Sequence, residues 1–109
     1  MNHSVYITDD AASDLQALFL YIESNDSTTS ANYVLDEISK AFESLNKNPE
    51  RGRIPTELQY LGISDFREIF FKPYRIIYRI INNDVYVMVI IDGRRDLQTL
   101  LQNRLLKPV

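Results

Sequence analysis

The 109-residue chain has no cysteine, no tryptophan and a single histidine, His3. Within one chain, these absences exclude zinc sites built from cysteine and histidine, cysteine nucleophiles and histidine-based catalytic triads. Only three glycines and four prolines are present while 45% of the residues are hydrophobic, which argues against disorder and low-complexity repeats. We therefore expect one domain over residues 1–109, with no disulfide, no metal and no cofactor.

Long apolar runs are also lacking. The longest, at residues 18–22 and 86–91, are far shorter than the roughly 20 residues that a membrane-spanning helix needs. The N-terminus has no basic region followed by an apolar one, as a secretion signal would have. We expect a cytoplasmic protein that does not contact a membrane.

The small net charge of −3 conceals an uneven distribution. Residues 1–50 contain nine acidic and two basic residues, a net charge of −7, whereas residues 51–109 contain ten basic and six acidic residues, a net charge of +4. Such asymmetry is typical of a chain that offers one basic face to an anionic partner. An ordinary solvated surface is the alternative, because charge alone reports on association and not on fold.

Apolar residues recur at helical spacing in two segments before Pro49. Thr8 is a favourable N-cap for the first segment, and Asp9 and Asp10 suit its first turn. The apolar positions are Ala11, Leu15, Leu18 and Ile22 in the first segment, and Ala31, Val34, Leu35, Ile38, Phe42 and Leu45 in the second. This spacing predicts an acidic helical hairpin.

The polar run at residues 24–30 separates the two predicted helices. It supplies the turn and an N-cap for the second helix from Asp26, Ser27 or Thr28. Pro49 ends the second helix, because proline disfavours the helical conformation of the preceding residue and lacks the backbone donor.

From residue 64 onward the apolar residues alternate at the period of a strand. In residues 74–81, Tyr74 and Tyr78 point with two isoleucines toward one face, while two arginines and the other isoleucines point toward the opposite face. The turn at 82–84 tolerates positive φ and leads into 85–91, so these strands should form a hairpin. Residues 64–71 and 4–7 are predicted as further strands.

Helical spacing returns after Gly93, where leucines recur at positions 97, 100, 101 and 105. We expect a short C-terminal helix whose leucine stripe stays exposed and marks a partner site. Such a stripe is compatible with a homodimer or a heterotetramer with a partner. The predicted fold is α+β, with a two-helix hairpin packed on a mainly antiparallel four-stranded sheet.

The order of these elements resembles the RelE/ParE superfamily of toxins from type II toxin–antitoxin modules, and the resemblance covers nearly the whole chain. The most specific motifs are the Tyr-Arg-Ile-Ile-Tyr-Arg strand at 74–79 and the Gly-Arg-Arg-Asp turn at 93–96. The supporting residues are Tyr6, Ile7, Thr8, Ala11, Asp14, Leu15, Tyr21, Ile22, Ser27, Ala31, Ile38, Pro49, Gly52, Arg53, Phe66, Arg67 and Glu68.

The superfamily implies two different activities. RelE-like members cut messenger RNA on the ribosome with basic sheet residues, an arginine four residues before the Tyr-Arg pair, and a histidine or tyrosine near the C-terminus. Here the arginine position is Phe70, the region of the sheet lysines holds Leu61 and Ile63, and His3 is at the wrong end. The cleavage needs a general base that is not apparent, and a net charge of −3 disfavours direct nucleic-acid binding.

The chain therefore resembles the ParE branch more closely. This resemblance implies that the protein has no catalytic residues and inhibits DNA gyrase by direct binding, trapping it on cleaved DNA. The chain departs from the ParE branch at the final turn, where Asp92 occupies the position of a common histidine.

The candidate partner-binding residues are Arg67, Arg75, Arg79, Arg94, Arg95, Leu97 and Leu101. Arg75 and Arg79 lie two strand steps apart and should project together, and Arg67 on the neighbouring strand can join them. Internal pairing with nearby acidic residues is the alternative.

The resemblance implies a cognate antitoxin whose acidic, disordered tail folds onto this protein, in a heterotetramer or a larger complex. Two other functions stay open. The protein could be a ribosome-dependent messenger-RNA endonuclease of the RelE type, or an antitoxin-binding module that is not toxic.

Overall fold

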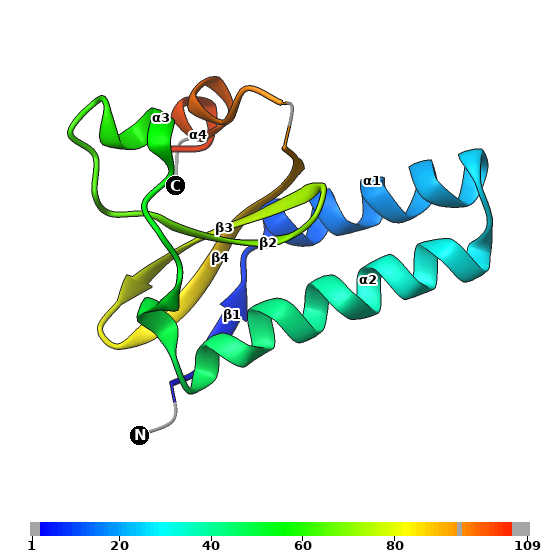
Figure 1. Cartoon of the computed structure of the whole chain (residues 1–109), viewed down its shortest axis with the longest axis horizontal. Helices are drawn as coiled ribbons and strands as arrows, with labels where there is room; N and C mark the ends of the chain where they lie inside the picture. Colours follow the sequence, from blue (N-terminus) through cyan, green and yellow to red (C-terminus); the bar gives the residue numbers. More distant parts are fainter. Residues whose placement is uncertain (1–2, 94, 106–109) are drawn as a thin grey trace.

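The computed structural model describes residues 3–93 and 95–105 of the chain. A four-stranded sheet lies between a long helical hairpin and two short helices (Figure 1). The strands and α-helices are β1 (Val5–Ile7), α1 (Asp9–Asn25), α2 (Thr28–Glu43), α3 (Thr56–Gln59), β2 (Arg67–Phe71), β3 (Tyr74–Ile81), β4 (Asp84–Asp92) and α4 (Leu97–Leu105). Two short 3₁₀ turns, Ser44–Asn46 and Pro49–Arg51, follow α2. The predicted α+β fold is confirmed.

The predicted helical hairpin has the expected caps. The hydroxyl oxygen of Thr8 accepts a hydrogen bond from the Ala11 amide at 3.2 Å and begins α1. Of the three candidates for the second cap, Ser27 is the one used, and its side chain accepts from the Ser30 amide at 3.0 Å. Each cap satisfies a backbone donor that the first helical turn leaves without a partner.

The sheet has the strand order β1-β4-β3-β2. Strands β2, β3 and β4 form an antiparallel meander, and β1 adds to β4 in parallel. The sheet is therefore mixed, with the mainly antiparallel character that the sequence predicted. The β3–β4 turn has positive φ at Asn82 and Asn83, 52° and 70°, as expected for a tight hairpin.

A bulge interrupts the pairing of β3 and β4. Ile77 lies opposite Val89 and Tyr78 lies opposite Val87, so that Met88 has no opposing residue. Because side chains alternate along a strand, one extra residue sends Val87 and Val89 to opposite faces of the sheet. The alternating pattern of the sequence gives no sign of this change.

Each face of the sheet carries its own hydrophobic core. On the hairpin face, which α1 and α2 cover, the buried residues are Ala11, Ile38, Leu45, Ile69, Ile76, Tyr78, Val85, Val87 and Ile90. On the α4 face, which α3 and α4 cover in part, they are Leu58, Phe66, Ile77, Val89, Ile91, Leu97 and Leu101. No helix of the described residues is long and apolar enough to cross a membrane.

The predicted exposure of the C-terminal leucine stripe is wrong. Leu97 and Leu101 are only 1% and 3% exposed, because they pack on Ile77 and Val89 of the sheet and on Leu58 of α3. Helix α3, which provides part of this second core, was not predicted from the sequence. The two leucines are therefore core residues in the isolated chain.

Candidate functional site

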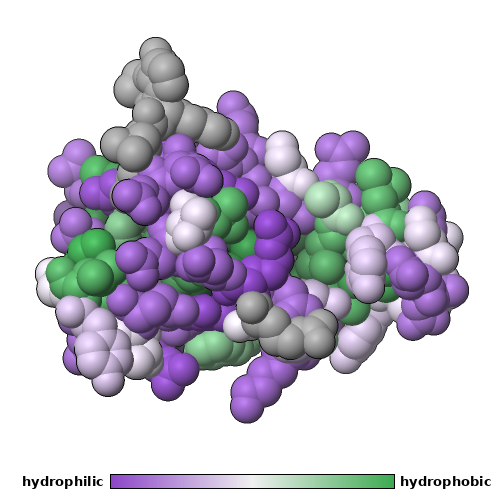
Figure 2. All heavy atoms as spheres, turned by 90° about the horizontal axis from the view of Figure 1, so that it is seen from above, coloured by the Kyte–Doolittle hydropathy of each residue, from purple (hydrophilic) through white to green (hydrophobic). Residues whose placement is uncertain are grey.

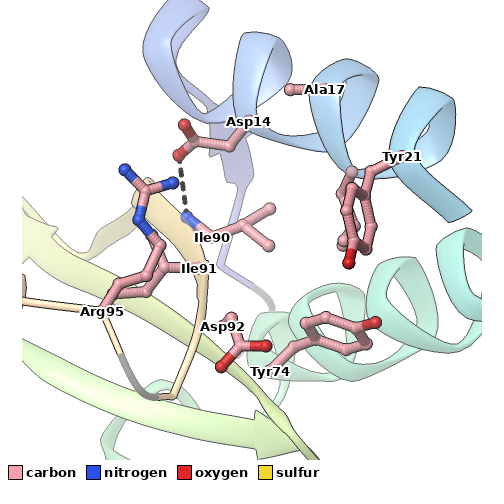
Figure 3. Close-up of a pocket in the computed structure, with 9 residues that line it drawn as sticks. Asp14, Ala17, Tyr21, Tyr74, Ile90, Ile91, Asp92 and Arg95 are labelled. Carbon is pink, nitrogen blue, oxygen red and sulfur yellow. Dashed lines mark hydrogen bonds between the residues drawn. The ribbon is translucent and has the colours of Figure 1, made fainter.

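A groove of about 340 Å³ separates α1 from the ends of β3 and β4. Its lining is formed by Asp14, Ala17, Leu18, Tyr21, Tyr74, Ile90, Ile91, Asp92 and Arg95. Tyr21 and Tyr74 lie at one end of the groove, and Asp14 and Arg95 lie at the other (Figure 3). The groove thus has apolar walls with polar groups at both ends, as ligand and peptide sites commonly do.

The exposed surface beside this groove is partly hydrophobic. Figure 2 shows hydrophobic side chains on the part of the helical hairpin that projects from the otherwise largely hydrophilic body. Leu20, Tyr21 and Tyr33 are all more than half exposed there. This combination of groove and exposed hairpin surface is a candidate partner-binding surface.

Asp14 and Arg104 close the edge of β4 where β1 no longer pairs with it. The Asp14 carboxylate accepts a hydrogen bond from the Ile90 amide at 2.9 Å, and the Arg104 guanidinium donates to the Met88 carbonyl at 2.8 Å. Arg104 also donates to both oxygens of Asp14, at 2.8 and 2.6 Å. These contacts satisfy the backbone groups at the bulge and tie α4 to α1.

The Asp14 carboxylate raises the pKa of Arg104 above its ordinary value. Both side chains of this pair are largely buried, so the charges are held where they stabilise one another. We assign the pair a structural role. This pair was not predictable from the sequence, because 90 positions separate the two residues.

Burial raises the pKa of the Tyr74 phenol above its ordinary value of 10.0, and the Asp92 carboxylate adds to the effect. Tyr74 is therefore protonated and neutral throughout the physiological pH range. It can offer a hydrogen bond and a ring surface to a ligand, but it is poorly suited to act as a general base.

Arg75 is buried in an ion-pair network on the α4 face. Its Nε donates to Glu68 at 2.7 Å, and its two terminal nitrogens donate to the two oxygens of Glu57 at 2.9 and 2.7 Å. The two carboxylates raise the pKa of Arg75, and the guanidinium lowers the pKa of Glu57. Arg75 is therefore paired within the protein, which is the alternative that the sequence left open.

Arg67 does not lie with Arg75 and Arg79, and the expectation that it joins them is wrong. Arg67 opposes Tyr78 across β2 and β3, which places it on the hairpin face. Its guanidinium donates to the carbonyls of Glu50 at 3.2 Å and Gly52 at 2.8 Å. Arg67 thus holds the segment between α2 and β2.

Arg79 and Arg95 are the two candidate arginines whose guanidinium groups form no hydrogen bond or ion pair with another described residue. The guanidinium of Arg79 lies over the ring of Phe66, 5.5 Å from its centroid, on the same face as Arg75. Arg95 is exposed and lines the groove beside α1. Arg94, the fifth candidate, lies outside the described residues.

Tyr78 and His3 both bond to backbone groups. Tyr78 is fully buried, and its hydroxyl donates to the Pro49 carbonyl at 2.6 Å and accepts from the Gly52 amide at 3.0 Å. His3 bonds the Asn83 carbonyl in the β3–β4 turn and does not line the groove. Among the described residues, no cluster of three histidine or acidic side chains could hold a metal ion.

A family model for the ParE toxin of type II toxin–antitoxin systems, parDE, matches residues 5–97. The chain belongs to the ParE toxin family. It is 30% identical over 84 residues to Toxin ParE3 of Caulobacter vibrioides, covering 77% of this chain and 80% of that protein. The resemblance found in the sequence is therefore confirmed, and the ParE family is the branch that matches.

Solved structures share the fold of this ParE-family toxin. The chromosomal ParDE system of P. aeruginosa has a TM-score of 0.70 at 18% identity and covers 83% of this chain and 95% of that one. A mutant of E. coli toxin RelE in the free state has a TM-score of 0.65 at 18% identity, covering 97% and 100%. The RelBE2 complex of Mycobacterium tuberculosis has a TM-score of 0.61 at 20% identity, covering 84% and 99%.

Proposed function

We propose that this ParE-family toxin inhibits DNA gyrase by direct binding, has no catalytic activity of its own, and is neutralised by a cognate antitoxin. Family membership supports the toxin role. The observation that best supports inhibition by binding is that Arg75, the buried arginine of β3, is paired with Glu57 and Glu68.

Cleavage of RNA by attack of a 2′-hydroxyl requires a base for its proton and a cation or acid near the leaving group. Arg75 is poorly placed to be that cation, because its Nε and both terminal nitrogens are bound to carboxylates. Tyr74 is poorly suited to be the base, because its pKa is raised. Inhibition by binding needs neither group.

The groove beside α1 suits an amphipathic segment of an antitoxin. Ala17, Leu18 and Ile90 supply apolar contacts, and the exposed Arg95 supplies a cation at one end. An acidic segment that folds on binding can bury apolar side chains in such a groove and place a carboxylate on the arginine. Solved relatives include a ParDE system and a RelBE2 complex, which favours an antitoxin partner here as well.

Inducible expression in a bacterium tests the proposal. We expect growth arrest with filamentation and a DNA-damage response while protein synthesis continues, and we expect co-expression of the antitoxin to restore growth. The variant Leu45→Asp is the control, because it introduces a charge at a fully buried core position and should abolish folding and toxicity.

Two outcomes would contradict the proposal. Rapid arrest of translation with cleaved messages would identify a ribosome-dependent endonuclease instead. Antitoxin binding without any growth defect would identify a binding module that is not toxic.

A further inference from the structure

We propose that Tyr6, Tyr86 and Arg79 form a second docking surface for the antitoxin, separate from the groove and specific for an acidic segment with an adjoining apolar side chain. We call these three residues the tyrosine–arginine row. The inference rests on the proposed neutralisation by an antitoxin and adds to it the place and chemistry of a second contact.

The row runs across three neighbouring strands on the α4 face. Arg79 of β3 lies opposite Tyr86 of β4, and Tyr86 lies beside Tyr6 of β1 in the parallel pair. The two tyrosine rings are stacked, with centroids 5.1 Å apart and an angle of 25° between their planes. The stack and the arginine thus present one continuous strip of side chains.

Helices α3 and α4 leave this half of the sheet uncovered. They pack over Ile77, Val89 and Ile91, which lie further toward the other end of β3 and β4. The row lies beyond the part of the sheet that α3 and α4 cover. Tyr6 is 48% exposed there, and the neighbouring Ile81 is 38% exposed. Exposed aromatic and aliphatic side chains together on a sheet face are characteristic of a protein-binding surface.

Arg79 supplies the positive charge of the row. Its Nε is buried and has no hydrogen-bond partner among the described residues, although its guanidinium rests on Phe66. Arg79 also differs from Arg75 on the same strand, whose donors are bound to Glu57 and Glu68.

The charge of the surroundings favours an acidic protein segment over a nucleic acid. The row contains a single cation, and Asp84 at its rim holds the Ser4 amide with its carboxylate. A nucleic-acid backbone carries a run of phosphates and needs several cations, whereas one arginine suffices for a single carboxylate. One carboxylate placed on Arg79, next to an apolar side chain on the tyrosine stack, would match the row in both charge and hydrophobicity.

Two pairs of variants test this inference with the purified antitoxin immobilised on a sensor surface. Arg79→Met removes the charge but keeps an apolar stem over Phe66, and Arg53→Met makes the same change in an arginine that stacks on Phe70 outside the row. Tyr6→Ser removes one ring of the stack, and Tyr60→Ser makes the same change at an 88% exposed tyrosine.

We expect Arg79→Met and Tyr6→Ser each to accelerate dissociation of the antitoxin about 10-fold or more, and the two control variants about 2-fold or less. Added salt should reduce the difference between wild type and Arg79→Met. Circular dichroism of each variant verifies that it is folded.

The outcomes separate this inference from the proposed function. If the wild type binds the antitoxin but all four variants dissociate at its rate, the row is not an antitoxin contact and the proposed function is unaffected. If the wild type does not bind the antitoxin, both this inference and the proposed neutralisation by an antitoxin are wrong. A labelled oligouridine serves as a nucleic-acid probe; binding that depends on Arg79 and Tyr6 would overturn the choice of an acidic protein segment.

Discussion

Arg75→Met should strongly destabilise the protein, because Arg75 is the principal partner of a buried carboxylate. The Glu68 side chain is only 1% exposed, and without Arg75 its nearest cation is Arg53, 3.7 Å away and itself 68% exposed. Removing one partner of a buried ion pair costs about 3–5 kcal/mol. For a chain of this size, such a loss lowers the Tm by roughly 12–20 °C.

Urea unfolding followed by circular dichroism measures this loss. The double variant Arg75→Met with Glu68→Leu removes both charges and should recover most of the stability, because no carboxylate is then left buried without a partner. Glu57 remains partly exposed to water in that variant. The matched control Arg53→Met should change the stability by about 1 kcal/mol or less.

A loss below about 1 kcal/mol for Arg75→Met would refute the assignment of Arg75 to the internal network. The double variant also tests the proposed mechanism. If it is folded and still inhibits growth, Arg75 has no catalytic role. If it is folded and inactive, Arg75 acts directly on the target.

Three further predictions concern the fold. Asp14→Asn should weaken the contact of α4 with α1 and destabilise the protein by about 1–3 kcal/mol in urea unfolding, and an unchanged stability would show that the edge of β4 does not need this carboxylate. Gly52→Ala should reduce the Tm measurably, because the added Cβ would lie 2.5 Å from the Tyr78 hydroxyl, and a Tm equal to that of the wild type would contradict the close packing of this loop. The pKa of Glu57 is lower in the folded protein than its unfolded value of about 4.5. The ion pair of Glu57 therefore stabilises the fold fully above pH 4.5, and this stabilisation is lost as the pH falls through the folded pKa. The free energy of unfolding, measured against pH, should show an acid step that the variant Glu57→Gln lacks.

The helical hairpin and the β3–β4 meander were predictable because their signals are local. Thr8 and Ser27 are caps followed by apolar residues at helical spacing, and Asn82 and Asn83 mark the turn of a hairpin. Helix α3 has only four residues and one buried leucine, Leu58, which is too short a segment for a period to be visible.

The roles of the arginines depended on contacts between distant parts of the chain. Arg75 is paired with Glu57 of the unpredicted helix α3, and Arg67 is held by carbonyls on the opposite face from Arg75. Leu97 was expected to be exposed because the sequence did not reveal that the second face of the sheet needs a cover. The distribution of charge predicted that the second half of the chain is basic. Only the folded structure shows which of its arginines are paired within the protein, and that Arg79 and Arg95 are not among them.

The most direct test of the central claim is a supercoiling and cleavage assay with the purified toxin, DNA gyrase and relaxed plasmid. We predict that micromolar toxin inhibits supercoiling and accumulates cleaved DNA, and that stoichiometric antitoxin reverses both effects. A parallel reaction with translating ribosomes should leave the messenger RNA intact. Unaffected gyrase together with cleaved messenger RNA would contradict the proposed function.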